Sequence, residues 1–392
     1  MSITESKPVQ MPTFLTLQTL GAANDNLVKQ AILVMIGFGL IHYPGPASLW
    51  TNAASGLFIL PFLLLSTRAG RWVAQHDLRA VMIRVKTLEI GCAVLACAGL
   101  LLGDVYLLLC ALTLLGVQSA YFGPAKFSWP ARTESSEDLP KVTGSIEALT
   151  FLAILLGSLI GGAMVENRLG LTILVMTAAI LGLVCAIRLP SVPVTDTQSV
   201  RRYADQPQTL QARRLISWFW FLGASYLTQL PLLANDIMNL APQQVSYLLA
   251  AFAVGVGAGS KLVPLFGNIA LRLGILMMIA AGLALPWVAG TSLTAGMILL
   301  AVVGLAGGLY VVPLYVWMQQ NLSAAELAQA IGLNNRLNAI LMVASAGFGI
   351  LALTLLSVST TLYFILLPAL TLLWLPPAFR FDPSPARDLD RT

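Results

Sequence analysis

Residues 273–325 decide the fold of this chain: they read LGILMMIAAGLALPWVAGTSLTAGMILLAVVGLAGGLYVVPLYVWMQQNLSAA and contain no Asp, Glu, Lys or Arg. A transmembrane helix needs about 20 mostly apolar residues, so this stretch is long enough for two helices. Gly290, Thr291 and Ser292 form a turn signal near its centre. The stretch therefore predicts two membrane-spanning helices, 270–289 and 293–318.

The rest of the chain has the same character. Of its 392 residues, 57% are hydrophobic and 10% are charged, whereas soluble domains carry roughly 25% charged residues. We therefore predict an all-α polytopic membrane protein with twelve transmembrane helices. Besides the two spans above, they lie near 14–41, 47–67, 81–103, 105–125, 142–165, 169–189, 215–236, 243–264, 328–354 and 359–377.

The basic residues predict how the spans are oriented. With both termini placed inside, 19 of the 22 lysines and arginines fall on the inner side, and Arg168 alone falls on the outer side. Lys86 is counted there with four arginines of the connection between spans 2 and 3. Cytoplasmic loops are enriched in Lys and Arg, so we expect both termini in the cytoplasm. This bias also accounts for the net charge of +5 without a nucleic-acid partner.

Short sequence matches divide the chain into two related halves. Tyr121-Phe-Gly-Pro recurs as Tyr310-Val-Val-Pro, Gly144-Ser-Ile-Glu as Gly332-Leu-Asn-Asn, and Leu20-Gly-Ala as Leu222-Gly-Ala. We expect two six-helix pseudo-repeats with a substrate site between them at mid-membrane, opened alternately to each side. A helical bundle without duplication is the alternative. The predicted parts are a cytoplasmic segment 1–13, bundles 14–189 and 215–377, a cytoplasmic linker 190–214 and a tail 378–392.

Charged and amide side chains in the first span form the leading candidate site. Asn24, Asp25, Asn26 and Lys29 lie in this span, with the acid four residues before the base. That spacing and order favour a pair on one helix face, and ionisable residues inside a membrane are expected to be functional. The alternative is a self-neutralising pair that only bonds neighbouring helices.

Three further sites complete the predicted set for substrate binding and transport. Tyr121 and Lys126 lie at the inner end of span 4, where the lysine can instead extend to the headgroups. Glu147 enters span 5 and is either a proton site or a partner of a nearby lysine. In span 11, a guanidinium flanked by amides suits a phosphate group. These residues are Asn335, Arg336 and Asn338.

Residues for catalysis are not visible in the sequence. The two histidines, His42 and His76, have no Asp five positions later, as an HxxxxD acyltransferase would need. The sequence lacks a G-x-S-x-G motif, a phosphate-binding loop and a metal-ligand cluster. We therefore expect neither enzymatic activity nor a cofactor or bound metal.

Several segments, spread in order over the chain, are similar to one known family. They are LGAANDNLVKQA (20–31), YFGPAKF (121–127), EALTFLAILLGSLIGG (147–162), SWFWFLGASYLTQLP (217–231), GGLYVVPLYVWMQ (307–319) and NNRLNAILMVAS (334–345). With twelve spans in two halves, the chain resembles the lysophospholipid transporter family of the major facilitator superfamily. The NDN-x-x-K and FGPAK elements are the most specific.

The resemblance implies a flippase-like transporter. It would move lysophospholipids, chiefly lysophosphatidylethanolamine, from the outer to the inner leaflet of the bacterial inner membrane, where a cytoplasmic acyltransferase restores the second chain. A monomer surrounded by membrane lipids is expected. Export of a drug or small metabolite, and a non-transporting scaffold for an acyltransferase, are the alternatives.

The resemblance also implies which residues act in transport, and where this chain departs from the family. The residues carried over by position are Asp25, Asn26, Lys29, Lys126, Glu147 and Asn335. The chain departs from the family pattern at three positions. Ala74 stands where an acid is usual, Arg132 stands where an acid is expected, and Arg336 stands where an apolar residue is expected.

Overall fold

A computed structural model describes residues 7–194, 206–241 and 244–384, and these residues form helices joined by short connections. Twelve helical segments of 20 residues or more follow one another, the last being Thr360–Arg380. The helices are α1 Lys7–Gly37, α2 Ala47–Ala74, α3 Leu78–Leu102, α4 Val105–Thr133, α5 Leu139–Ala163, α6 Arg168–Arg188, α7 Pro207–Leu232, α8 Val245–Phe266, α9 Ala270–Ala289, α10 Leu293–Asn321, α11 Ala324–Gly349, α12 Thr360–Thr371 and α13 Leu375–Arg380.

The helices confirm the predicted all-α membrane fold. Nine stretches of the described residues are long and apolar enough to cross a membrane, and one of them, Val245–Ala289, contains both α8 and α9. α1 is not among the nine, because Asn24, Asp25, Asn26 and Lys29 interrupt its apolar sequence. The predicted spans and the observed helices share their central residues throughout.

The largest differences from the predicted spans lie at helix ends. α2 continues to Ala74, α4 continues to Thr133 and α7 begins at Pro207, each several residues beyond the predicted apolar span. Hydrophobic length predicts the part of a helix that lies in hydrocarbon, whereas the backbone remains helical into the polar interface. The N-cap residues of α3, α6 and α10 each accept a hydrogen bond from a backbone N–H through their side chain. These residues are Asp77, Asn167 and Ser292.

The chain divides into two compact units. One contains residues 1–133, 152–203 and 324–336, and the other contains 134–151, 204–323 and 337–392. α5 and α11 therefore each contribute one part to each unit. The predicted bundle boundaries stay a prediction, and parts of the predicted segment 1–13, linker 190–214 and tail 378–392 lie outside the described residues.

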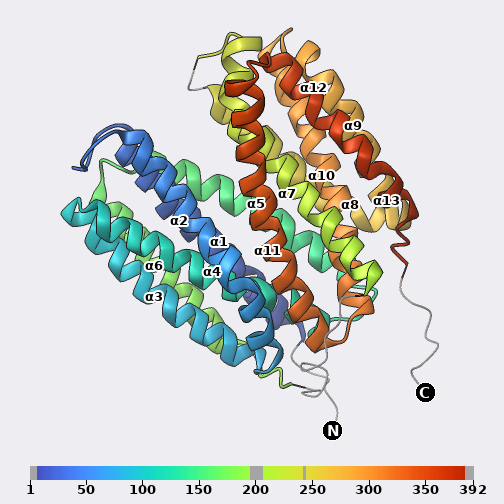
Figure 1. The fold of residues 1–392 in the computed structure, drawn as a ribbon. Coiled ribbons are helices and arrows are strands. Elements are labelled where there is room, and N and C mark those ends of the chain that lie inside the picture. The colour runs from blue at the N-terminus through green and yellow to red at the C-terminus, as the bar shows by residue number, and fades with distance from the viewer. Residues whose placement is uncertain (1–6, 195–205, 242–243, 385–392) are drawn as a thin grey trace. The chain divides into compact units, whose positions relative to one another are not determined.

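Helix pairing repeats between the two halves of the chain. In the first unit the packed pairs are α1·α2, α1·α4, α1·α6, α2·α4, α3·α4 and α3·α6 (Figure 1). In the second unit the pairs α7·α8, α7·α10, α7·α12, α8·α10, α9·α10 and α9·α12 occur. Adding six to each helix number converts the first set into the second. The helices of the predicted six-helix repeat therefore pack in the same pairs in both units.

The sequence repeat predicts that Gly144 and Gly332 are equivalent, and each of them allows two helices to cross closely. Gly332 of α11 lies against α2, where an added Cβ would be 2.5 Å from the Ser66 carbonyl oxygen and 2.9 Å from the Gly70 Cα. Gly144 of α5 lies equally tightly against the Ser260 carbonyl oxygen of α8. The repeated sequence Gly144-Ser-Ile-Glu and Gly332-Leu-Asn-Asn therefore marks positions where two backbones touch.

Candidate functional site

A buried polar cluster joins three helices of the first unit. Its centre is an ion pair on α3, in which the Lys86 Nζ donates to the Glu89 Oε2 over 2.6 Å. Both side chains are 0% exposed. Because the two residues are three positions apart on one helix, they lie on the same face. Removing charges from water is costly unless they are paired and hydrogen-bonded, and this pair meets that requirement.

Amide groups from two other helices hold the Glu89 carboxylate. Gln118 of α4 donates its Nε2 to the Glu89 Oε2 over 2.9 Å, and Asn24 of α1 donates its Nδ2 to the Oε1 over 3.5 Å. On the other side of the pair, the Lys86 Nζ lies 5.3 Å from the centre of the Phe122 ring. The carboxylate of Glu89, a residue of α3, therefore accepts hydrogen bonds from side chains of α1, α3 and α4.

Asp25 belongs to the same cluster through Ser119 of α4. The Ser119 hydroxyl faces the Asp25 Oδ2 and also the Gln118 Oε1, which is 2.9 Å away. One hydroxyl proton serves only one of these two acceptors at a time. Within the described residues, the buried Oδ1 atoms of Asn24 and Asp25 have no hydrogen-bond partner. The cluster therefore leaves two buried acceptor atoms without a donor.

Asn26 and Lys29 lie beside this cluster on α1 and have other partners. The Asn26 Nδ2 donates to the Ala22 carbonyl of its own helix over 2.8 Å. The Lys29 Nζ lies over the Phe58 ring, 5.4 Å from its centre, and still interacts electrostatically with Asp25. The expected pairing partner of Asp25 was Lys29, but the hydrogen bond that the structure gives Asp25 comes from Ser119.

The structure brings the predicted α4 and α11 elements together. The Asn335 side chain lies directly on Gly123 of α4, so closely that a Cβ there would collide with its Nδ2. Tyr121 packs edge-on against Trp72 of α2, with ring centres 5.5 Å apart. The Lys126 Nζ lies 5.1 Å from the centre of the Phe127 ring. Thus Tyr121 and Asn335 both join α4 to a second helix of this unit.

The remaining predicted residues, Arg336, Asn338 and Glu147, lie on α11 and α5. Arg336 is exposed and is the last residue of α11 that belongs to the first unit. In the second unit, Asn338 accepts a hydrogen bond from the Ser217 hydroxyl over 2.7 Å. Glu147, also in the second unit, is buried on α5 with 2% exposure.

Sequence reasoning missed four members of the cluster as candidates, namely Lys86, Glu89, Gln118 and Ser119. The charge pattern counts Lys86 among the basic residues of the inner side, which stays a prediction, whereas the structure shows it fully buried and paired with Glu89. The spacing of Lys86 and Glu89 within one span was the available signal. For Gln118 and Ser119 the signal was two adjacent polar residues directly after the largely apolar sequence 105–117.

The arrangement has the chemistry of a binding site. In the part of the chain that the structure describes, no group of three His, Cys, Asp or Glu could hold a metal ion. Two unsatisfied acceptors in the cluster favour a ligand that donates hydrogen bonds, above all a cationic one. Buried charges in membrane helices commonly mark substrate or ion pathways.

Comparisons with known proteins identify the class. The family model described as Major Facilitator Superfamily matches residues 30–346. The chain belongs to this superfamily of transporters, and it is a multi-pass membrane protein.

Sequence relatives confirm the narrower resemblance. The chain is 25% identical over 332 residues to a protein named lysophospholipid transporter LplT from Yersinia enterocolitica, covering 79% of this chain and 78% of that protein. It is 28% identical over 326 residues to the protein of the same name from Serratia proteamaculans, covering 77% and 78%. The chain is therefore similar to lysophospholipid transporters within the superfamily.

Solved structures support the fold. The human organic anion transporter MFSD10 has a TM-score of 0.74 with 14% identity, covering 95% of this chain and 99% of that one. The fucose:proton symporter FucP of E. coli, as a variant with a single substitution, has a TM-score of 0.75 with 12% identity, covering 96% and 98%. At these identities the likeness concerns the fold alone.

Proposed function

We propose that the chain transports lysophospholipids, chiefly lysophosphatidylethanolamine, from the outer to the inner leaflet of the bacterial inner membrane. The names of the sequence relatives support this substrate class. The observation that carries the proposal is the pair of buried acceptor atoms without a donor in the cluster around Asp25, because the ammonium group of an ethanolamine headgroup is a cationic donor. A single acyl chain can remain against the apolar helix surfaces while the headgroup crosses.

The residues divide the recognition of such a headgroup between them. We assign the ammonium to the unsatisfied Oδ1 atoms of Asn24 and Asp25. We assign the phosphate to cationic side chains, with exposed Arg336 and the Lys29 ammonium as the candidates. Transport then proceeds by alternating access, with both termini in the cytoplasm. A cytoplasmic acyltransferase consumes the product, and the transporter acts as a monomer.

Substitution of Asp25 tests this proposal. Asp25→Asn keeps the shape and removes the charge that attracts the ammonium, and a hydrogen bond to a charged group is worth about 1.5–3 kcal/mol. We expect at least a roughly tenfold slower initial uptake of labelled lysophosphatidylethanolamine into proteoliposomes. Asp138→Asn is the matched control, because Asp138 is exposed beside Ser135. Reconstituted amounts are matched by fluorescence-detected chromatography.

The same assay separates the proposal from its alternatives. Uptake by Asp25→Asn at the wild-type rate contradicts the assignment of the ammonium to this cluster. Competition by soluble drugs or metabolites, with no flux of lysolipid, favours an exporter. No flux of any substrate through the wild-type protein favours a scaffold.

A further inference from the structure

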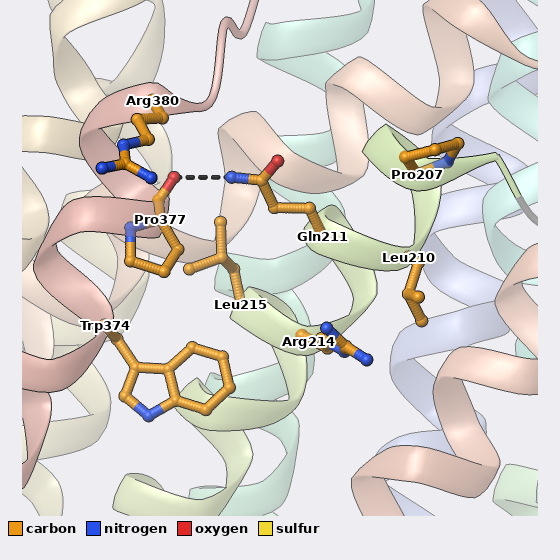
Figure 2. Close-up of a pocket in the computed structure, with 8 residues that line it drawn as sticks. All are labelled: Pro207, Leu210, Gln211, Arg214, Leu215, Trp374, Pro377 and Arg380. Carbon is orange, nitrogen blue, oxygen red and sulfur yellow. Dashed lines mark hydrogen bonds between the residues drawn. The ribbon is translucent and has the colours of Figure 1, made fainter.

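A crevice at one end of the second unit is independent of the polar cluster and shares no residue with it. Its volume is about 570 Å³, which is within the range of about 300–1,000 Å³ typical of small-molecule sites. The start of α7 forms one wall and the end of the segment Thr360–Arg380 forms the other (Figure 2). The lining residues that matter for binding are Gln211, Arg214, Trp374, Pro377 and Arg380.

The walls of the crevice are fixed by contacts between the two helices. The Gln211 Nε2 of α7 donates to the Pro377 carbonyl of α13 over 2.7 Å (Figure 2). Trp374 stacks on Trp218 of α7, with ring centres 5.2 Å apart and ring planes inclined by 20°. Trp218 is itself held by a hydrogen bond of 3.3 Å to the Thr371 hydroxyl. The space is therefore part of the packed structure.

The charge of the crevice is entirely positive. Arg214 from α7 and Arg380 from α13 line it, and no Asp or Glu is among the eight lining residues. Both arginines are exposed. A guanidinium offers five N–H donors in a geometry that matches phosphate oxygens. Two such groups, with no acid to hold an ammonium group, favour an anionic phosphate over a zwitterionic headgroup.

The surroundings of the crevice are those of a membrane surface. Leu372 and Leu373, directly before Trp374, are 49% and 72% exposed. They belong to Thr360–Arg380, a stretch that is apolar enough to span a membrane. Trp and Arg commonly lie at the headgroup level of a bilayer. A lipid whose phosphate enters the crevice can thus keep its acyl chains beside these leucines.

We propose that this crevice binds the phosphate headgroup of an anionic diacyl phospholipid of the surrounding membrane. The lipid is bound at a fixed site and is not transported. Basic pockets between membrane helices on the cytoplasmic side are known to hold such headgroups. The positive-inside prediction places Arg214 and Arg380 on that side.

Retention of lipid by the purified full-length protein tests the proposal. Native mass spectrometry compares phosphatidylglycerol with phosphatidylcholine. We expect the wild type to retain phosphatidylglycerol preferentially, and Arg214→Gln/Arg380→Gln to bind it about tenfold more weakly, near the level of phosphatidylcholine. The matched control is Arg68→Gln/Arg188→Gln, which removes the same charge from two exposed arginines outside the crevice. Retention by the crevice variant equal to that of the wild type would overturn the proposal.

Two further measurements keep the test decisive. Glycerol 3-phosphate and inorganic phosphate at millimolar concentration should leave phosphatidylglycerol bound, and displacement by either identifies a soluble-anion site instead. Brominated phosphatidylglycerol should quench less tryptophan fluorescence in Trp374→Phe than in the wild type. Equal quenching shows that no lipid lies beside Trp374, as expected if another segment of the chain fills the crevice. That result overturns the proposal, and it does so even if the arginine variant does not fold.

Discussion

The buried Lys86–Glu89 pair gives the sharpest prediction. Glu89→Gln keeps the size of the side chain and an oxygen that can accept from Gln118, but it removes the anionic hydrogen-bond partner of the Lys86 ammonium. The other neighbours of this ammonium are the Phe122 ring, 5.3 Å away, and Asp25, with which it interacts electrostatically. Removing one partner of a buried ion pair costs about 3–5 kcal/mol. We take about 3 kcal/mol, because part of the hydrogen bonding is kept.

Lys86→Met and the double variant complete a thermodynamic cycle. In Lys86→Met, Glu89 keeps two amide donors at 2.9 and 3.5 Å, so we expect a loss of about 2 kcal/mol. In Lys86→Met/Glu89→Gln no charge is left unpaired, and the total loss should be only about 1–2 kcal/mol. The two residues are then coupled by about 3 kcal/mol.

Thermal unfolding in detergent, followed by fluorescence-detected chromatography, measures these differences. For a unit of about 200 residues, 3 kcal/mol corresponds to a drop of about 6–12 °C in the unfolding temperature. We expect such a drop for Glu89→Gln and substantial recovery in the double variant. If the double variant loses the sum of the two single losses, the pair is not coupled and our account of the cluster is wrong.

Two further predictions concern close contacts. Gly332→Ala should lower the unfolding temperature because its Cβ would meet the Ser66 carbonyl oxygen. The control is Gly347→Ala on the same helix, where the added Cβ meets nothing and the change should be neutral or stabilising by up to about 1 kcal/mol. Equal shifts of the unfolding temperature in the two variants would contradict the close crossing of α11 and α2. Gly123→Ala should displace Asn335 and slow lysolipid uptake several-fold at unchanged stability, and wild-type uptake would show that the position of this amide is unimportant.

The helices of this chain were predictable because a single physical quantity governs them. The length of an apolar run predicts a span, and for 270–289 the predicted range equals the observed α9 Ala270–Ala289. Helix ends were less predictable, because hydropathy does not indicate how far a helix continues into the polar interface. α4, for example, continues to Thr133 past the predicted end at 125.

The partners of the charged residues were not predictable from spacing alone. Asp25 and Lys29 have the spacing of a pair, yet Asp25 accepts from Ser119 and Lys29 lies over Phe58. Neighbouring helices supply competing partners, and these depend on packing that no local pattern encodes. For Lys86, a place near the start of its span suggested the membrane surface, while Glu89 three residues later provides its actual partner.

The second half of the chain provides an internal comparison for the charged cluster of the first half. α9 pairs with α10 and α12 as α3 pairs with α4 and α6, yet residues 273–289 contain no charged side chain. When Leu20-Gly-Ala is aligned with Leu222-Gly-Ala, the position equivalent to Asp25 is Leu227. The second half thus forms the same helix pairs with apolar residues at these places. Helix packing alone therefore does not account for these buried charges, which are costly in a membrane, and this supports the headgroup binding that we propose for the cluster.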